Sequence, residues 1–493
     1  MYNRNMKNIL FISDSFLHGG LESHIAEQIR EYKKNGINTF IACDNFEMGY
    51  NENFFQKVFS DIGFISKDYV LSARTILDAS EKIINICKKN NIDFIECQPF
   101  WNIIPAVIAA EECKIPVSYT LHGTASGDFV DHVAFREASI IVYLCLRFGF
   151  DRMFAVSERL ANIYAYLSKD ILVTRNNITE VSDKRRKFEK KGNFVIASRM
   201  DVPKSDVVMK FLPYLYKNKN VKRIDIYGDG DCFELLSEYI KEHGYENKVF
   251  LKGWVNNLPV ILAQERYDCA FGVGRIVMDA ISAHTPVGIL GYGGFTEIID
   301  KNNIESYAKT NFISWDAQKE GAVERAIREL YANPTRFIFS KKDLAMFNAE
   351  KNWKKHIDQL SECKYRKKSI IEEMRKLLKA NMDENILGEE NMMDSLYSLL
   401  LNSGDSCVHI NSLKVFCEYF SERNKKMLAE LEVKNEVLGQ KNQELEKKKK
   451  NDALLIKAIT NDNEILKRQV RDFENSTSWK ITKPIRKIKD CFK

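Results

Sequence analysis

The chain has 493 residues, of which 45% are hydrophobic and 29% are charged, and its formal net charge is +6. This length predicts two or three domains with packed cores. So small a net charge excludes a protein whose whole surface binds nucleic acid. The 11 cysteines lack CxxC pairs and zinc-binding spacing, which is typical of a reduced cytosolic protein.

The first apolar run, residues 8–13, is too short for the core of a secretory leader, and Asp14 follows it directly. The longest apolar stretch, residues 138–146, is about half as long as a membrane span. We therefore expect no transmembrane helix, and any membrane contact should be peripheral.

Residues 1–180 predict a first α/β domain, because short β-branched runs alternate with helical stretches. Residues 20–36 predict an amphipathic helix that Gly36 ends. The expected strands are 8–13, 38–44, 93–99, 116–122 and 152–157. Such a sheet is parallel and binds its ligands at the carboxyl ends of its strands.

A polar, basic linker at residues 181–192 interrupts the pattern, which then restarts as a second α/β domain over 193–340. The expected strands here are 193–199, 223–230, 248–253, 267–273 and 285–291. Two open α/β domains in series predict a cleft between them.

Residues 341–420 predict an all-helical region, including a helix that returns to the first domain. Residues 421–475 form a charged helical stretch with a heptad pattern in which apolar d positions recur, broken at Asp452. Asparagine at three a positions, Asn435, Asn442 and Asn463, is typical of parallel dimers. We expect a coiled coil and a homodimer, and the alternative is a solvated single helix.

Two loops in the first domain are candidates for binding. Gly19 and Gly20 lie between a strand and a helix start, where backbone N–H groups bind phosphate, although a simple turn would look the same. His122, next to Gly123 at the end of a strand, offers an imidazole beside accessible backbone, although a lone histidine is more often structural.

In the second domain a strand ends at Arg199, and Lys204 follows near a predicted helix start. Two cations at the end of a strand suit a diphosphate, and the alternative is ordinary surface charge. Gly228 and Gly230 form another strand-to-helix turn. The stretch 271–299 then contains two glycine turns, each expected to precede a helix.

The order of these pieces resembles that of the GT-B glycosyltransferases, in particular the retaining family-4 type that uses nucleotide sugars. The matching segments are "GGLESHI" (19–25), "LHG" (121–123), "VSERL" (156–160), "RNNI" (175–178), "SRMDVPK" (198–204), "IYGDGD" (226–231), "FLKGWV" (250–255), "GRIVMDAISAHTPV" (274–287) and "GGFTEII" (293–299). The resemblance covers about residues 6–365. It implies an α/β fold of GT-B type, with two Rossmann-like domains facing a cleft.

The resemblance implies roles for particular residues. Arg199 and Lys204 would hold the diphosphate and stabilise the leaving phosphate without a metal, and His122 would face the donor sugar. Asp279 matches an acidic position that usually binds the ribose hydroxyls. The full set of implied donor-binding residues is Gly19, Gly20, Gly228, Gly230, Gly253, Arg275, Asp279, Gly293, Gly294 and Glu297. Neither a cofactor nor a metal is expected.

One departure from the family concerns an acidic residue. The family usually carries two glutamates eight residues apart, and this chain has Phe271 and Asp279 at those positions. The missing glutamate usually touches donor-sugar hydroxyls, so the identity of the sugar is open. Arg275 lies close by and could compensate.

The last segment, residues 476–493, carries six basic side chains and one acidic one. A basic amphipathic segment with Trp and Phe is typical of contact with an anionic membrane, and a disordered basic tail is the alternative. The segment resembles the endings of bacterial polysaccharide-assembly glycosyltransferases. The expected membrane contacts are Trp479, Lys480, Lys483, Arg486, Lys487 and Lys489.

These features together predict a retaining glycosyltransferase that moves a sugar from a nucleotide-diphosphate sugar to a growing, lipid-linked bacterial surface glycan. It would be cytoplasmic and peripherally associated with the inner face of the cell membrane. The alternative is a catalytically inactive GT-B scaffold of a glycan-assembly complex. A phosphorylase or an epimerase is less favoured, because neither a pyridoxal-phosphate lysine motif nor paired cleft carboxylates are apparent.

Overall fold

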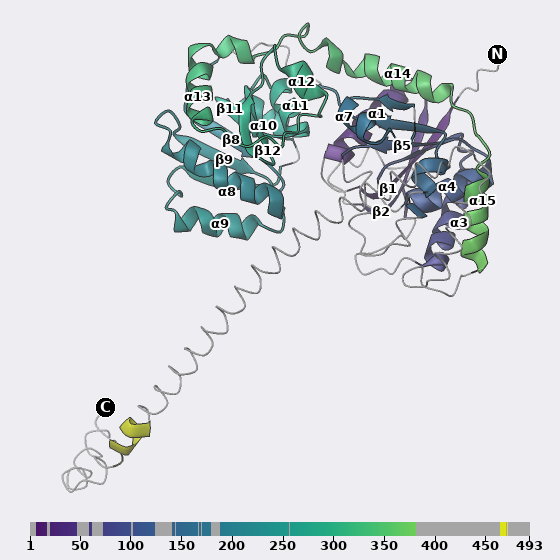
Figure 1. The fold of residues 1–493 in the computed structure, drawn as a ribbon, viewed down its shortest axis with the longest axis horizontal. Helices are drawn as coiled ribbons and strands as arrows, with labels where there is room; N and C mark the ends of the chain where they lie inside the picture. Colours follow the sequence, from purple (N-terminus) through teal and green to yellow (C-terminus); the bar gives the residue numbers. More distant parts are fainter. Residues whose placement is uncertain are drawn as a thin grey trace, which may run out of the picture. The chain divides into compact units, whose positions relative to one another are not determined.

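The structure is a computed structural model of the chain. It describes residues 6–16, 20–46, 59–61, 72–99, 102–123, 141–142, 144–165, 167–168, 170–178, 188–255, 257–380, 464–469 and 471. The chain divides into two compact units, Met1–Gly404 and Asp405–Lys493. Both α/β domains lie in the first unit, each built around one sheet (Figure 1).

The N-terminal domain contains a seven-stranded, fully parallel sheet in the order β3-β2-β1-β4-β5-β6-β7. Its strands are β1 (Asn8–Phe16), β2 (Asn38–Phe46), β3 (Phe59–Asp61), β4 (Phe94–Cys97), β5 (Val117–Leu121), β6 (Arg152–Ala155) and β7 (Ile171–Val173). Its described helices are α1 (Gly20–Lys34), α3 (Ala73–Lys89), α4 (Ile103–Cys113), the π-helix η2 (Cys145–Gly149) and α7 (Glu158–Ile163). The continuous apolar run 9–12 in β1 is fully buried, as expected for a parallel strand covered on both faces.

The second domain contains a six-stranded sheet in the order β10-β9-β8-β11-β12-β13, in which only the edge strand β13 runs antiparallel. Its strands are β8 (Asn193–Ala197), β9 (Arg223–Tyr227), β10 (Val249–Gly253), β11 (Cys269–Gly272), β12 (Val287–Gly291) and β13 (Gly294–Ile298). Its described helices are α8 (Val202–Lys217), α9 (Phe233–Glu242), α10 (Leu258–Glu265), α11 (Arg275–Ser282), α12 (Ile304–Ala308) and α13 (Ala322–Ala332), with the 3₁₀ turns η3 (Pro334–Phe337) and η4 (Ala345–Phe347). One apolar cluster covers each face of this sheet.

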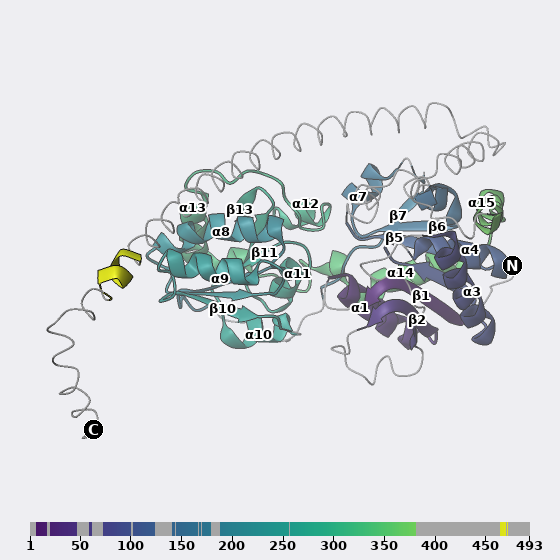
Figure 2. The same cartoon turned by 90° about the horizontal axis from the view of Figure 1, so that it is seen from below.

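The chain then returns to the N-terminal domain through α14 (Ala349–Ser361) and α15 (Ser369–Ala380). Helix α14 packs on α1, and α15 packs on α3 and α4 (Figures 1 and 2). Leu360 of α14 belongs to the same apolar cluster as Ile9 and Phe11 of β1. The helices that follow the second domain are therefore part of the core of the first.

Buried polar contacts fix both returning helices. His356 of α14 lies against Thr174 and the fully buried Glu96 of β4. Before α15, Lys368 donates a 2.8 Å hydrogen bond to Asp151, and both residues are buried. Because a buried polar group costs free energy when it is unpaired, these contacts favour one docking geometry for each helix.

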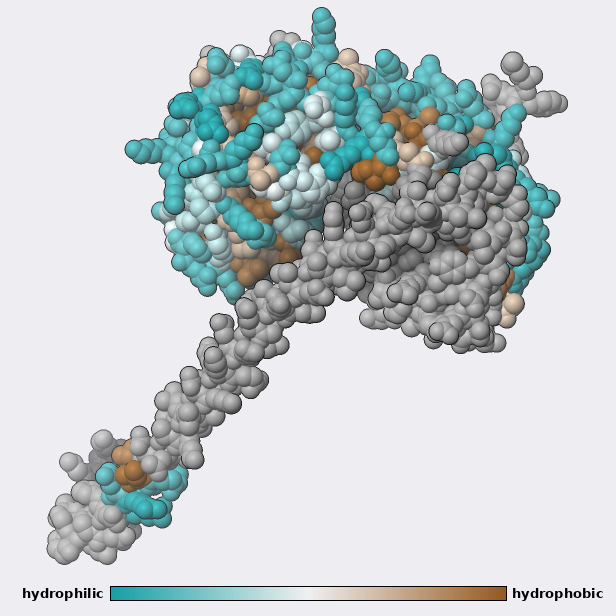
Figure 3. Space-filling model, in the orientation of Figure 1, coloured by the Kyte–Doolittle hydropathy of each residue, from teal (hydrophilic) through white to brown (hydrophobic). Residues whose placement is uncertain are grey.

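The surface drawn in Figure 3 is mainly hydrophilic, with separate apolar patches on the first unit. In the second unit, residues 464–469 are helical and exposed, within the stretch predicted to form a coiled coil. The rest of that stretch and the basic tail 476–493, apart from residue 471, lie outside the described residues. No helix among the described residues is long and apolar enough to cross a membrane.

We predict that Trp353→Ala destabilises the first unit by about 3–5 kcal/mol, because it empties a large buried site. Trp353 of α14 is 1% exposed, and its indole Nε1 donates a 3.0 Å hydrogen bond to Glu27. The measurement is the midpoint of thermal unfolding of the full chain.

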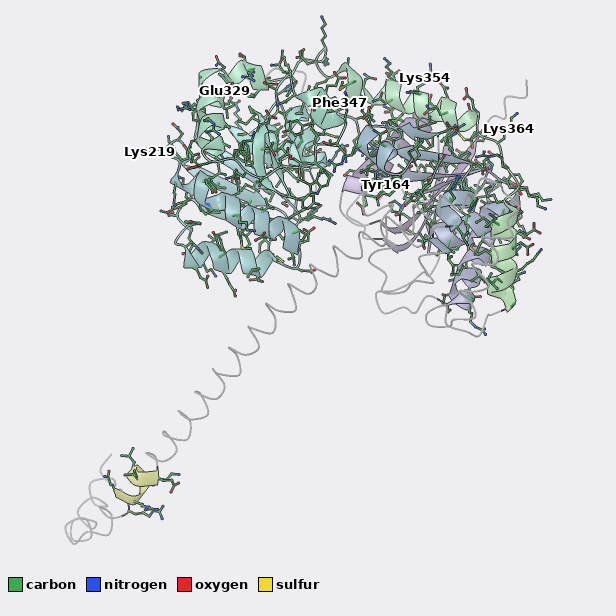
Figure 4. All side chains as sticks on the ribbon, in the orientation of Figure 1. Tyr164, Lys219, Glu329, Phe347, Lys354 and Lys364 are labelled. Atoms are coloured by element: carbon green, nitrogen blue, oxygen red, sulfur yellow. The ribbon has the colours of Figure 1, made fainter. Side chains whose placement is uncertain are left out.

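The control is Lys354→Ala. Lys354 is the next residue of α14, is exposed and points away from the domain (Figure 4). We expect this substitution to change the free energy of unfolding by less than about 0.5 kcal/mol. Equal melting temperatures for the two variants would contradict the role of α14 in the core.

Candidate functional site

The candidate site lies where three central strands of the second sheet end. The carboxyl ends of β8, β11 and β12 surround a narrow pocket that is partly open to solvent. Ser198, Lys204, Gly272, Gly291 and Tyr292 are among the residues that line it. Parallel α/β sheets bind ligands at this edge, because loops and helix starts gather there.

Arg199 and Lys204, the two predicted diphosphate ligands, converge on one carboxylate in this structure. Arg199 Nη2 lies 3.3 Å from Asp201 Oδ2, and Lys204 Nζ lies 3.5 Å from the same oxygen. Arg199 is mostly exposed, whereas the Lys204 side chain is 18% exposed. Burial lowers the pKa of Lys204, and the nearby Arg199 lowers it further. Both cations thus lie beside the same carboxylate, and Lys204 also lines the pocket.

Backbone packing explains the loop that carries these cations. Asp201 caps α8 by accepting a hydrogen bond from Lys204 N, which fixes the position of Lys204 in the first turn of the helix. Gly228 has φ +140°, and a Cβ atom there would lie 1.7 Å from the carbonyl oxygen of Ser198. Gly230 is packed in the same way against Met200. These two glycines therefore allow the turn after β9 to support the 198–201 loop.

Gly253 ends β10 and joins this arrangement through its carbonyl, which accepts a 2.9 Å hydrogen bond from Gly228 N. Its φ of +68° is the left-handed conformation that glycine adopts easily. The resemblance places Gly228, Gly230 and Gly253 near the nucleotide base. Close backbone packing explains Gly228 and Gly230, and the positive φ explains Gly253, whatever binds there.

The expectation that a helix follows Gly293 and Gly294 is wrong. Gly294 begins strand β13, which pairs antiparallel with β12 through a tight hairpin. A Cβ atom on Gly293 would lie 2.3 Å from Asp316 O, so the glycine is needed where residues 315–316 cross the hairpin. Glu297 also lies on β13, is exposed, and accepts a hydrogen bond from Tyr307. No helix N-terminus is therefore present at this turn to bind a sugar or phosphate.

Phe271, at the position of the family's first glutamate, lies in the apolar core. It is 1% exposed on β11 and contacts the rings of Phe211, Phe295 and Phe194. A carboxylate at this point would be desolvated among aromatic rings. The departure from the family thus removes the acidic group from the pocket and adds to the core.

Arg275, on α11, connects three parts of the chain. Its Nε lies 3.2 Å from Asp279 Oδ1, and its Nη1 lies 3.4 Å both from Glu27 Oε2 of α1 and from the carbonyl oxygen of Asn177. Burial raises the pKa of Asp279, and Arg275 acts in the opposite direction. Asp279, the predicted ribose ligand, is therefore already an ion-pair partner in this structure.

Glu27 extends the connection to the returning helix, because its other oxygen accepts the hydrogen bond from Trp353. His24, one turn earlier on α1, lies 2.7 Å from Asn176 and packs edge-on against Trp353. Burial lowers the pKa of His24 to about 4, so this imidazole is neutral near neutral pH. The two α/β domains and α14 thus meet around Glu27.

In the N-terminal domain, His122 follows β5 and its Nε2 lies 2.6 Å from Oε1 of the fully buried Gln98. Burial lowers the pKa of His122 well below its usual value, and His24 contributes to the shift. The two histidine rings pack edge to face with centroids 4.8 Å apart. His122 therefore adds a neutral polar group at the carboxyl end of this sheet.

Gly20 begins α1 beside α11, because a Cβ atom there would lie 3.6 Å from Cβ of Arg275. Gly19 lies outside the described residues. So do the predicted membrane contacts Trp479, Lys480, Lys483, Arg486, Lys487 and Lys489. Within the described ranges, no group of three or more His, Cys, Asp or Glu side chains is arranged to hold a metal ion.

Sequence reasoning missed Glu27, Trp353, Tyr292 and Trp315. Glu27 is buried on the same face of α1 as apolar residues, and Trp353 is an isolated tryptophan in a polar helix. Both were visible as exceptions to a local pattern. Their partners, however, lie more than 200 residues away in the sequence, so no local pattern could have paired them.

Comparisons with known proteins agree with this architecture. The chain resembles Anabaena Alr3699/HepE, solved in complex with UDP-glucose, with a TM-score of 0.53 and 14% identity over 72% of this chain and 99% of that one. It resembles S. aureus TarM with a TM-score of 0.51 and 12% identity over 73% and 99%. It also resembles sucrose-phosphate synthase from Thermosynechococcus elongatus, with a TM-score of 0.50 and 13% identity over 76% and 98%.

Two Rossmann-like domains in series, with a helix that returns to the first, define a protein of the GT-B fold class. Residues 18–171, in the N-terminal domain, match the model of Glycosyltransferase Family 4. No curated protein sequence matches the chain significantly.

We predict that Arg275→Met lowers the free energy of unfolding by about 2 kcal/mol at neutral pH, because it leaves Glu27 and Asp279 without their cation. Burial already raises the pKa of Asp279, and losing Arg275 raises it further. The native variant then binds a proton more readily than the unfolded chain. The difference in free energy of unfolding between the wild type and this variant should therefore become smaller as the pH falls from about 7 to about 5.

The measurement is chemical unfolding of both proteins across this pH range. The control is Arg266→Met, because Arg266 forms an exposed pair with Glu189 and should contribute under about 1 kcal/mol. A deficit for Arg275→Met that does not change with pH would contradict the buried ion pair.

Proposed function

We propose that the protein is a metal-independent, retaining glycosyltransferase that transfers a hexose-like sugar from a nucleotide-diphosphate sugar to a glycan. The convergence of Arg199 and Lys204 on the Asp201 carboxylate, with Lys204 lining the strand-end pocket, is the observation that carries this proposal. The fold class and the family-4 match support the same reaction type. That the HepE structure contains UDP-glucose supports a nucleotide sugar as donor.

The proposed chemistry is electrostatic. A diphosphate carries more negative charge than the Asp201 carboxylate, so it can take over both cations when it binds. Arg199 and Lys204 then neutralise the charge that develops on the leaving phosphate, which is the work a metal ion does elsewhere. The leaving phosphate accepts the proton of the attacking hydroxyl on the same face of the sugar.

The other predicted site residues take binding roles in this proposal. His122 and Gly20 approach the donor from the N-terminal domain, and Asp279 binds the ribose after exchanging part of its contact with Arg275. The remaining proposed donor contacts come from Gly228, Gly230 and Gly253 on one side of the cations, and from Gly293, Gly294 and Glu297 on the other.

We further propose that the acceptor is a growing, lipid-linked bacterial surface glycan. The protein would then work at the inner face of the cell membrane, with the tail 476–493 as its contact. Residues 421–475 would form a homodimeric coiled coil. Leu466, at a predicted d position, is 55% exposed in the single chain, as a partner-facing leucine would be.

The test of the enzymatic proposal is Lys204→Ala. It should reduce transfer by about a hundredfold or more, because it removes a group that stabilises charge in the transition state. It should also reduce the rise in melting temperature that UDP- or GDP-sugars cause in the wild type. Turnover is measured with donor and acceptor panels, and binding is measured by thermal shift.

The matched control is Lys210→Ala on the same helix, where Lys210 is 74% exposed and pairs with Asp206. We expect this change to leave both measurements unaltered. Full turnover in Lys204→Ala would refute the role of the lysine. If no nucleotide sugar raises the melting temperature of the wild type, the inactive-scaffold alternative is favoured instead.

We also predict that removing residues 476–493 abolishes binding to vesicles containing anionic lipid and leaves the dimer intact. The charge that attracts the membrane would be gone, while the heptads would remain. Vesicle co-sedimentation and light scattering measure the two properties.

The reciprocal variant is Leu466→Asp, which keeps the tail and should weaken the dimer, with Arg468→Asp at an outward heptad position as its control. Undiminished vesicle binding by the truncated chain would exclude the tail as the membrane contact. A monomeric wild type would exclude the coiled-coil dimer.

A further inference from the structure

Two large aromatic side chains are exposed next to each other, and one of them, Tyr292, lines the pocket. Tyr292 is 40% exposed and Trp315 is 44% exposed. Their rings are nearly parallel, with an interplanar angle of 21° and centroids 6.0 Å apart. This is an offset arrangement, in which neither ring fully covers the other. We call this pair the aromatic shelf.

The shelf is built into the fold. The backbone N–H of Tyr292 donates a 2.9 Å hydrogen bond to Ser314 O, and that of Gln318 donates a 3.1 Å bond to Gly293 O. Gly291 lets the same segment lie close, because a Cβ atom there would come within 2.2 Å of Ser314 O. The backbone at Trp315 is therefore held against the β12–β13 hairpin, which keeps the two residues close together. Because this backbone is already ordered, a ligand that binds to the two rings loses little free energy in ordering it.

The shelf adjoins the proposed reaction centre. Tyr292 lines the same pocket as Lys204. Burial raises the pKa of Tyr292, and the Asp201 carboxylate, which pairs with both cations, raises it further. A ring stacked on the shelf would thus lie beside the group that the cations hold.

The N-terminal domain also reaches the shelf. The Arg159 guanidinium lies over the Trp315 ring, 4.0 Å from its centroid. Arg159 lies in α7 of the N-terminal domain, and its backbone N–H donates a 3.0 Å hydrogen bond to Lys309 O in the second domain. The shelf therefore lies at the boundary between the two domains, with the Arg159 guanidinium over part of the Trp315 ring.

A different exposed aromatic residue lies on the opposite side of the cations. Trp254 is 40% exposed and directly follows β10, whereas Tyr292 of the shelf directly follows β12. In the sheet order, β8 with its two cations separates these strands. A nucleotide sugar needs one side for its base and the other for its sugar. Of the two sides, the one with the shelf borders the N-terminal domain.

We propose that Tyr292 and Trp315 form a saccharide-binding shelf, which stacks a pyranose ring of the acceptor next to the transferred sugar. This inference rests on the proposed function and names its acceptor side. The C–H bonds on the apolar face of a pyranose carry partial positive charge and suit the negative face of an aromatic ring. Arg159 donates to ring hydroxyls or to a carboxylate, which gives the shelf its polar contact.

The experiment uses the full chain with UDP or GDP at saturation. Binding of gluco-, galacto-, manno-, N-acetylglucosaminyl and uronic disaccharides is measured by saturation-transfer NMR, and binding of the nucleotides is measured by calorimetry. Trp315→Ala and Tyr292→Ala should each weaken saccharide binding by about tenfold, and Trp315→Ala should retain the nucleotide affinity. Trp315→Tyr should restore most of the saccharide signal.

Trp254→Ala is the matched control, for which we expect weaker nucleotide binding and unchanged saccharide binding. If Trp315→Ala instead weakens nucleotide binding alone, the shelf holds the nucleobase and the proposal is overturned. It is also overturned if the wild type binds no saccharide in the panel, or if both shelf variants bind as the wild type does. A wild type that binds saccharide but no nucleotide would leave the shelf standing and refute the proposed transferase.

Discussion

The arrangement of the site depends on one desolvated ion pair, between Glu27 of α1 and Arg275 of α11. Arg275 is three-quarters buried and also contacts Asp279 and the Asn177 carbonyl, while Glu27 also binds the Trp353 indole. Charges placed so far from water need these partners, because any alternative arrangement leaves one of them unpaired. The pair therefore favours a single placement of α1, α11 and α14 around it. Since α1 begins at one candidate binding loop and α11 follows another, the same contact fixes both loops.

The cations of the pocket are positioned by a different means, namely close contact between backbones. Gly228 and Gly230 leave room for residues 198–200. The Asp201 cap then fixes the first turn of α8 and so the position of Lys204. Asp201 also lies within ion-pair distance of Arg199 and Lys204, so the loop is electrostatically satisfied before any ligand binds. A pre-organised pair of cations loses little on reorganisation when an anion replaces the carboxylate, and this is the condition under which such groups contribute most to catalysis.

The sequence allowed the α/β class, the order of the two domains and most strands to be predicted, because parallel strands are short buried apolar runs with local signals. It also placed Arg199 and Lys204 near each other, since both lie within one strand-to-helix turn. It failed at Gly293, where the same glycine pair is compatible with a helix start or with a hairpin, and the crossing of residues 315–316 decides between them. It could not assign Phe271 to the core, because the aromatic cluster is assembled from four elements. The Glu27–Arg275 pair joins positions 248 residues apart, beyond the reach of any local pattern.

Phe271 and Arg275 together bear on how a sugar could be recognised here. The residue that usually contacts sugar hydroxyls in the family that the chain resembles is replaced by a core phenylalanine, and the arginine nearby is engaged by two carboxylates. Neither side chain is then available to read the hydroxyl pattern of a donor. Under the proposed function, recognition of the sugar would then fall to the polar edge of the N-terminal sheet at His122, to the backbone of the β12–β13 hairpin, and to the surfaces beside it. A site of this kind discriminates by shape and stacking more than by carboxylate–hydroxyl pairing, so its specificity should depend on which rings fit beside the hairpin rather than on a single acidic residue.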